Sequence, residues 1–376
     1  MMGERRHQMS KITGIALATA TAVASLAAAS APASADMAAA EKLIADHRHM
    51  PSFTPPGPAF DAKKCMAGKS IFVIPLASSN PFNVAIAKSM ASSAKEVGFK
   101  LTIWENQAKL DQWVQGMANA GSQGFSLIDL MGGIPPAALG PQIKEARGKG
   151  IKVTTTHLYD VTQPIPDDLD GSTQDNYTEA GQIMAAWAIT HTGGKPNVII
   201  IGSDEVVPTK PFVKAIEDYI DKNAPGSKHV YINVPFPEWG TKIQPSVQSA
   251  LVADPGINYV LPIYDNMATF VVPALRVTNK TDSVKIVSFN GSPGMLDLLR
   301  QGGMEMNVGE SLGWWGMAGV DADMRAACGL PKVINPHTPL IIFDKDNVAT
   351  AGVPADYDKG YGDVHVDGFL KLWGLK

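Results

Sequence analysis

The sequence predicts an α/β protein of two lobes, each built around a parallel sheet with helices on both faces. Three observations predict this fold. The chain has 376 residues, 45% of them hydrophobic and 18% charged, which is more than a single ordinary core requires. From residue 70 onward, short apolar runs alternate with amphipathic segments. A second series of the same kind follows an irregular stretch at residues 161–171, and such alternation is typical of doubly wound sheets.

The first 35 residues have the pattern of a secretory signal peptide. Three basic residues precede an Ala-rich run over residues 12–29, and Ala33-Ser34-Ala35 supplies the small residues of a cleavage site. A membrane anchor is the alternative, but Ala, Thr and Ser dominate the run and the cleavage site follows at once. We therefore expect residues 1–35 to be removed on export, leaving a soluble periplasmic chain with no direct membrane insertion.

Residues 36–69 differ from the rest of the chain in composition. They open with an Ala-rich helical stretch and continue with four prolines between positions 51 and 58, which are incompatible with regular structure. We interpret this segment as an extended leader on the surface.

The elements of the two lobes follow from the apolar pattern. In the first lobe we predict strands at 71–76, 100–104, 125–130 and 151–155, separated by helices at 82–97, 110–120 and 136–149. In the second we predict helices at 177–191, 210–222, 241–253, 267–278 and 294–301, which alternate with strands at 198–201, 229–234, 259–262, 285–289 and 306–310. Ligands of open parallel sheets bind beyond the carboxyl ends of the strands, so the loops after these strands should form a cleft.

Charge and motifs exclude several classes of function. The formal net charge is −4, and removal of the basic leader makes it more negative, which argues against nucleic acid or an anionic membrane as a partner. The sequence has no Gly-x-Ser-x-Gly elbow, no Walker-type loop and no His-x-x-x-His or Cys-x-x-Cys spacing. We therefore expect a binding protein and not an enzyme, with no cofactor and no metal ion.

The two cysteines, Cys65 and Cys328, are an even pair in an exported chain. This favours a disulfide, although two unpaired buried thiols remain the alternative.

Residues 71–82 combine an apolar run with an Asn-Pro-Phe turn, and further motifs are Asp175-Asn176, residues 264–268 and the turn at 288–293. Together these segments resemble the ribose-binding type of periplasmic solute-binding proteins, and the Asn-Pro-Phe turn is the most specific match. The resemblance, which runs from about residue 70 to about residue 343, implies the type I fold, in which three crossing strands form a hinge between the lobes. It implies an N-terminal lobe of residues 70–173 plus 311–343 and a C-terminal lobe of residues 174–310 plus 344–376.

The resemblance also implies a set of ligand-binding residues. Asn80 matches the residue of the first loop that hydrogen-bonds to the ligand in this family, and Phe82 matches the aromatic ring that stacks on it. Asn83 stands where a second aromatic residue is common. His157 falls where the family places an Asp, with Leu158 in place of the Arg that follows it. The second-lobe positions implied in the same way are Trp239, Tyr264, Asn290 and Glu310.

These substitutions change the chemistry that the family uses for sugars. Loss of the Asp-Arg pair removes charge-assisted hydrogen bonds to the hydroxyls of a sugar ring. Aromatic residues with mixed donors and acceptors would suit a small polar cyclic ligand, namely a sugar, a polyol or a related planar solute. A cation is a further alternative, because Glu310 among aromatic rings favours positive charge. Two structural alternatives to ligand binding are also left open. Glu310 would form a structural ion pair in one, and Trp239 would pack in the core of the second lobe in the other.

For the whole protein, the resemblance implies the substrate-binding component of an ABC importer, a monomer that delivers its ligand to a permease in the inner membrane. The alternative is a ligand-sensing periplasmic module that presents its closed form to a chemoreceptor or a sensor kinase. The resemblance also places Cys65 and Cys328 in the same lobe, where a disulfide would fasten the leader without blocking closure of the hinge.

Overall fold

The computed structural model describes residues 35–333 and 335–376. The predicted signal peptide therefore lies outside the described residues, apart from Ala35 at its end. In the part of the chain that is described, every helix is too short or too polar to traverse a lipid bilayer.

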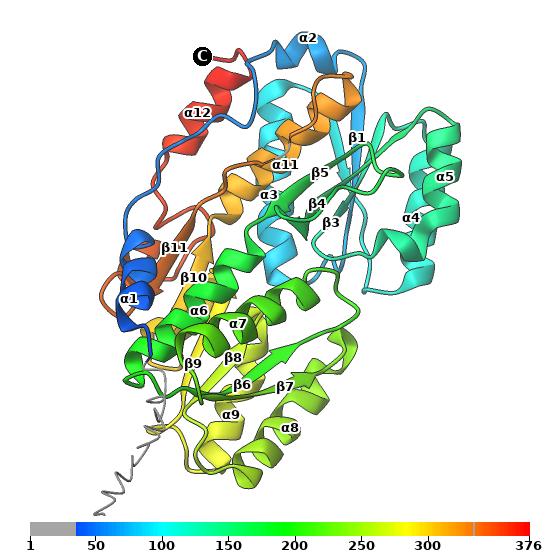
Figure 1. Ribbon diagram of the computed structural model, residues 1–376. Helices are drawn as coiled ribbons and strands as arrows, with labels where there is room; N and C mark the ends of the chain where they lie inside the picture. Colours follow the sequence, from blue (N-terminus) through cyan, green and yellow to red (C-terminus); the bar gives the residue numbers. More distant parts are fainter. Residues whose placement is uncertain (1–34, 334) are drawn as a thin grey trace, which may run out of the picture. The chain divides into compact units, whose positions relative to one another are not determined.

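The first lobe contains a five-stranded sheet in which all neighbouring strands are parallel (Figure 1). Its order is β2-β1-β3-β4-β5, formed by Ser70–Pro75 (β1), Lys100–Ile103 (β2), Leu127–Met131 (β3), Lys152–Asp160 (β4) and Gly171–Asp175 (β5). One face packs on α3 (Pro81–Val97) and α11 (Leu312–Ala327). The other face packs on α4 (Leu110–Ser122) and α5 (Gly140–Gly148). The predicted doubly wound arrangement is confirmed for this lobe.

Strand β5 was not predicted, because its sequence is Gly-Ser-Thr-Gln-Asp and carries no apolar residue. All five residues are nevertheless buried, since β5 pairs with β4 at the edge of the sheet and lies under α11. Hydrogen bonding to β4, and not an apolar side-chain pattern, makes this segment a strand.

The second lobe contains a six-stranded sheet of order β11-β10-β9-β8-β6-β7. Its strands are Asn197–Gly202 (β6), Lys228–Asn233 (β7), Tyr259–Pro262 (β8), Lys285–Asn290 (β9), Met306–Glu310 (β10) and Leu340–Asp344 (β11). All are parallel except β11, which pairs antiparallel with β10. Helices α6 (Tyr177–His191) and α7 (Thr209–Asn223) cover one face. The opposite face is covered by α8 (Trp239–Ala253), α9 (Ala268–Val277) and α10 (Pro293–Arg300).

The chain passes from one lobe to the other after β5, after β10, between α11 and β11, and again between β11 and the C-terminal helix. Two predicted domain segments are wrong in part at this end of the chain, although α11 lies in the first-lobe core and residues 348–361 lie against the second-lobe core as predicted. Residues 311–343 were assigned to the first lobe, but β11 lies in the second sheet. Residues 344–376 were assigned to the second lobe, but α12 (Val364–Leu372) shares the first-lobe core with α11. Apolar patterns show that a segment is buried, but they do not show which lobe buries it.

The leader contacts both lobes. Its first helix, α1 (Met37–Asp46), packs on α6 through Ala40 and Ile44. Its second helix, α2 (Ala62–Met66), lies on the first lobe, where Cys65 forms a disulfide with Cys328 directly after α11. Between the two helices the leader is extended, as the prolines predict, but both of its ends are anchored in a core.

Candidate ligand site between the lobes

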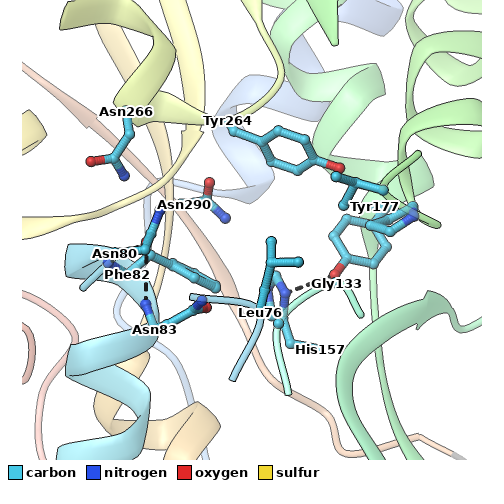
Figure 2. Close-up of a pocket in the computed structure, with 13 residues that line it drawn as sticks. Leu76, Asn80, Phe82, Asn83, Gly133, His157, Tyr177, Tyr264, Asn266 and Asn290 are labelled. Carbon is cyan, nitrogen blue, oxygen red and sulfur yellow. Dashed lines mark hydrogen bonds between the residues drawn. The ribbon is translucent and has the colours of Figure 1, made fainter. Parts of the chain in front are cut away.

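A pocket lies between the two lobes, where the carboxyl ends of their parallel strands meet. It comprises about 470 Å³ of space not filled by atoms, which includes open solvent. Figure 2 shows side chains from the start of α3 on one side of the pocket and the two tyrosines on the other. The pocket is lined by Leu76, Asn80, Phe82, Asn83, Gly132, Gly133, His157, Tyr177, Val206, Pro208, Tyr264, Asn266 and Asn290.

Six of the eight predicted ligand residues are brought together here: Asn80, Phe82, Asn83, His157, Tyr264 and Asn290. The strand-end rule explains why residues so far apart in sequence meet at one place. That these residues bind a solute stays a prediction.

Asn80 and Asn83 position the start of α3. The Asn80 side chain is the N-cap, with Oδ1 accepting from the backbone N–H of Phe82 at 2.9 Å and of Asn83 at 3.3 Å. Pro81 occupies the first helical turn, where its missing N–H costs nothing. Asn83 Nδ2 donates to the carbonyl of Ala77, while its Oδ1 is buried without a hydrogen-bond partner. A Cβ at residue 132, whose φ is +75°, would collide with this oxygen, so only glycine fits there.

His157 reaches the pocket because β4 is irregular at this residue. The pairing of β4 with β5 shifts register between Thr156 and Asp160, and His157 adopts a positive φ of 59°. Such a bulge redirects a side chain away from the regular alternation of the strand. The imidazole lies edge-on to the rings of Phe82 and Trp315, each at a centroid distance of 4.7 Å.

The imidazole of His157 is fully engaged in polar contacts that join the lobes. Its Nε2 lies 2.8 and 2.9 Å from the two carboxylate oxygens of Glu310 and 3.2 Å from Oδ2 of Asp175. Its Nδ1 lies 2.8 Å from the hydroxyl of Tyr177 (Figure 2). Asn290, which has a φ of 130°, donates from Nδ2 to Glu310 Oε1 at 2.8 Å. Glu310 therefore forms a buried ion pair, the structural alternative left open by the sequence.

These contacts determine the protonation of the cluster. Burial alone would lower the pKa of His157, but Glu310 and Asp175 outweigh it and raise this pKa to about 10. Burial raises the pKa of Glu310, and the charge of His157 opposes that rise. We place the proton on His157, because Nε2 faces both oxygens of Glu310 at nearly equal distances.

Among the described residues, His157, Asp175 and Glu310 form a group whose ligating atoms lie within 4.8 Å of one another, close enough to hold a metal ion. The distances from Nε2 to Glu310 are those of a charge-assisted hydrogen bond and are shorter than the spacing of two ligands around a zinc ion. The geometry therefore fits a protonated imidazole better than a metal ligand.

Trp239 does not line the pocket, and its predicted role in ligand binding is not supported by its position. Its side chain is 8% exposed and belongs to the second-lobe core. Its Nε1 donates to Ser203 Oγ at 2.8 Å, and its ring stacks behind Tyr264 at a centroid distance of 6.1 Å. Residue 239 begins α8, so the side chain is directed into the core beneath that helix.

Sequence reasoning missed several residues of the pocket. Tyr177 comes directly after the Asp175-Asn176 motif, and its place beside a family motif could have identified it as a pocket residue. Val206 and Pro208 come from the loop after β6, where the resemblance was too weak to assign residues. Leu76, Gly132 and Gly133 carry no polar side chain, so no chemical pattern identified them.

The pocket combines apolar and uncharged polar surface. Among the described residues that line it, none is Asp, Glu, Lys or Arg. Its one imidazole is paired with carboxylates outside the pocket, and its other polar side chains are amides and tyrosine hydroxyls. Such a surface can hold a solute by apolar contact and a few hydrogen bonds, without a formal charge on either side.

Solved structures with the same fold are found among solute-binding proteins. One is a 5-methylthioribose transporter solute-binding protein from Thermotoga lettingae, in complex with 5-methylthioribose. It has a TM-score of 0.67 and 20% identity, over 85% of this chain and 95% of that chain. Another is an ABC transporter solute-binding protein from Agrobacterium vitis bound with α-D-tagatopyranose. It has a TM-score of 0.68 and 16% identity, over 77% of this chain and 99% of that chain.

A glucose-galactose binding protein from Geobacillus stearothermophilus is similar as well, with a TM-score of 0.66 and 20% identity over 74% of this chain and 98% of that chain. At these identities the likeness concerns the fold alone. No curated protein matches this chain significantly by sequence. The family model described as periplasmic binding protein domain matches residues 71–331, well over half of the chain. The chain therefore belongs to the periplasmic binding protein domain family.

Proposed function

We propose that this protein captures a small, uncharged, cyclic solute in the pocket between its lobes and acts as the substrate-binding component of an ABC importer. The observation that carries the proposal is that the pocket is lined by residues from the strand ends of both lobes. A solute held by both lobes stabilises their closed arrangement, which is the state that a permease can recognise.

The pocket supports an uncharged solute over a charged one. Its wall offers no partner for a free carboxylate or ammonium group, because His157 is already paired with Glu310 and Asp175. Leu76, Val206 and Pro208 add apolar surface. Sugars, polyols and related planar molecules remain the classes to test, and those with an apolar substituent fit this wall best.

The proposed cellular location and transport role rest on the solved neighbours and on residues 1–35. The solved neighbours include ABC transporter solute-binding proteins, and residues 1–35 have the pattern of an export signal. We propose that the exported chain works in the periplasm as a monomer and delivers its solute to a permease.

We propose further that the solute leaves unchanged, because the one imidazole of the pocket is held by carboxylates and a tyrosine and is not free to act as a base.

The test is a thermal-shift screen of sugars, polyols, methylthio and deoxy sugars, aromatic acids and amines. A solute present at a hundred times its dissociation constant adds ~2.7 kcal/mol to the free energy of unfolding, so a true ligand raises the melting temperature clearly. We expect uncharged cyclic solutes to do so and amines and acids to have no effect.

Val206→Trp provides the site-specific variant, because Val206 is 6% exposed in a loop and a larger side chain there would fill the pocket. We expect it to abolish the shift. Val277→Trp is the matched control, since Val277 is 66% exposed at the end of α9. Binding that persists in Val206→Trp, or a screen in which only charged molecules bind, would contradict the proposal.

A further inference from the structure

The loop between β7 and α8 carries a phenylalanine that contacts both lobes. Phe236 packs on the apolar cluster that α8, α9 and α10 form with the second sheet, and also on the cluster that α4 and α5 form with the first sheet. The residue is half-buried and does not line the pocket. Phe236 therefore lies where the lobes meet, outside the pocket described above.

The position of this loop follows from the second sheet. Strands β6 and β7 are parallel neighbours, so their carboxyl ends lie side by side at the edge of the sheet that faces the first lobe. The loops that follow these strands are joined by hydrogen bonds. The N–H of Phe236 donates to Oε1 of Glu205 at 2.5 Å, and the hydroxyl of Ser203 donates to the carbonyl of Val234 at 2.7 Å. The two loops therefore form one unit.

Prolines on either side limit the motion of Phe236. Pro235 and Pro237 have fixed φ angles, and each proline also restricts the residue before it. The N–H of Glu238 donates to the carbonyl of Pro235 at 2.8 Å, at the short 3-10 turn Phe236–Glu238. The loop has little conformational freedom to lose when the lobes come together, so more of the free energy of the contact favours closure.

A second contact between the lobes comes from the loop after β6. A Cβ on Gly133 would lie 3.0 Å from Cγ1 of Val206 and 3.4 Å from Cδ2 of Leu76. Gly133 and Leu76 belong to the first lobe and Val206 to the second, and all three line the pocket. Apolar surface of both lobes is thus removed from water at the loops after β6 and β7, which favours the closed arrangement.

Phe236 is connected to the pocket by a series of aromatic rings. Its ring meets the ring of Trp239 edge-on at a centroid distance of 4.7 Å, and Trp239 stacks behind Tyr264 at 6.1 Å. Tyr264 lines the pocket. A movement of Phe236 therefore changes the packing of the ring that supports Tyr264.

Hydrogen bonds follow the same route. Trp239 Nε1 donates to Ser203 Oγ at 2.8 Å, and Thr209 Oγ1 donates to the carbonyl of Ser203 at 2.6 Å. Because the proton of the Thr209 hydroxyl is used in this bond, the hydroxyl of Tyr264 donates to Thr209 Oγ1, at 3.0 Å. The ring and the hydroxyl of Tyr264 are thus both held by residues in contact with the two joined loops.

We propose that Phe236 is a positioning residue for closure: it packs on the first lobe when the lobes close, and through Trp239 it holds Tyr264 in place at the pocket wall. This inference rests on the proposed function, because it concerns closure over a solute. It adds a residue outside the pocket that sets how readily closure occurs. Loss of the Phe236 ring should therefore favour the open arrangement and alter the surroundings of Tyr264.

Phe270 distinguishes this role from ordinary core packing. It lies on α9 and is partly buried, as Phe236 is. Within the described part of the chain, it packs on the same second-lobe cluster as Phe236 and on neither first-lobe cluster. Phe270→Ala therefore removes the same side chain from the same core without removing a contact between the lobes.

The test measures the distance between the lobes in the full purified chain without any solute. Spin labels are attached to cysteines introduced by Glu145→Cys on α5 and Val252→Cys on α8, two exposed positions in different lobes. The native cysteines, Cys65 and Cys328, are bonded to each other, so only the introduced thiols react. Double electron–electron resonance then gives the distribution of distances between the labels.

We expect Phe236→Ala to raise the ratio of long to short distances at least about fivefold, because it removes an apolar contact that exists only when the lobes are closed. Phe236→Leu keeps much of the apolar surface and should stay close to the wild-type distribution. Phe270→Ala should leave the distribution unchanged. If Phe236→Ala fails to fold by circular dichroism, Phe236→Val, which keeps part of the side chain, should show the same change at reduced size.

Fluorine NMR of the chain labelled with 3-fluorotyrosine reports on the pocket ring. The signal of Tyr264 is the one that disappears in Tyr264→Phe. We expect this signal to shift in Phe236→Ala, and to shift less in Phe270→Ala, because only Phe236 packs on the ring of Trp239 and on the first lobe together.

Two kinds of result would overturn the proposal. An unchanged distance distribution in Phe236→Ala, or an equal change in Phe270→Ala, would exclude the role in closure. A Tyr264 signal that does not respond to the loss of Phe236 would exclude the connection to the pocket. Because no solute is used, a thermal-shift screen without a ligand contradicts the proposed function, whereas unchanged distances contradict only the role of Phe236.

Discussion

His157 illustrates how one residue can connect two lobes and still leave a pocket uncharged. Its side chain extends from the bulge in β4 and contacts Asp175, Tyr177 and Glu310, which lie at the end of β5, the start of α6 and the end of β10. Each of these positions is at or beside a passage of the chain between the lobes. Because the carboxylates outweigh the effect of burial, the folded protein favours the protonated imidazole.

This protonation predicts a pH dependence of stability. The pKa of His157 is about 10 in the folded protein and about 6.5 in an unfolded chain. Its contribution to stability is therefore complete below about pH 6.5 and is lost as the pH rises toward 10. Urea unfolding between pH 7 and pH 9 should show a falling free energy of unfolding.

Glu310→Gln tests the origin of this dependence. Removing one partner of a buried pair should lower the free energy of unfolding at pH 7 by about 3 kcal/mol. The remaining decrease between pH 7 and pH 9 should be smaller than in the wild type. Glu145→Gln, which removes an exposed pair with Lys149, is the control and should not alter the slope. Equal slopes in Glu310→Gln and the wild type would contradict this account of His157.

At the scale of elements, the two ends of the leader are fastened to different lobes. Helix α1 lies on α6 of the second lobe, and α2 is linked to the end of α11 in the first. Between them, Phe53 packs on Trp314 and Phe369, and the carbonyl of Pro58 accepts from Arg325. Arg325 itself is paired with buried Asp321, so the leader covers an ion pair that would otherwise face solvent.

The disulfide should contribute substantially to this arrangement, because Cys65 and Cys328 are 263 residues apart in sequence and closing a long loop restricts the unfolded chain strongly. We expect the double variant Cys65→Ser/Cys328→Ser to lower the free energy of unfolding by about 3 kcal/mol, measured by urea unfolding. Reduction of the wild type should have the same effect. Two free thiols titrated in the oxidised, denatured wild type would show that the bond does not form.

At the scale of the whole molecule, the pocket requires loops from both lobes to act together. Residues 76–83 and 132–133 come from the first lobe, while residues 206–208 and 264–266 come from the second. Opening of the hinge would separate these two groups and expose both to solvent. A bound solute should therefore restrict all four segments together, and not one lobe alone.

Hydrogen exchange can measure this coupling once the thermal-shift screen has identified a solute. We expect the solute to slow amide exchange in the segments of both lobes, and a sugar that gives no thermal shift to leave exchange unchanged. Protection confined to one lobe would mean that the solute binds without closure, and the proposed role of the pocket would then be wrong.

Particular elements show how far the sequence could be interpreted. The strands β1, β6 and β8 were predictable because they are nearly continuous apolar runs, and β3 because only Asp129 interrupts its apolar run; a buried parallel sheet accommodates such runs. Strand β5 was not, because its residues are polar and backbone pairing alone makes it a strand. The loops of the pocket could be located from the strand-end rule, but the orientation of a side chain such as Trp239 depends on the helix that follows.

The amino-acid sequence by itself determined the fold class and the family resemblance, because the alternation of apolar runs and the turn motifs are local properties of the chain. Only the tertiary structure decided that His157 pairs with Glu310 across the lobes, that α12 returns to the first lobe, and that Asp323 of α11 lies near Asp129 of β3. The physical reason is that the charge state and partners of a buried polar group depend on residues distant in sequence, and folding alone brings these together.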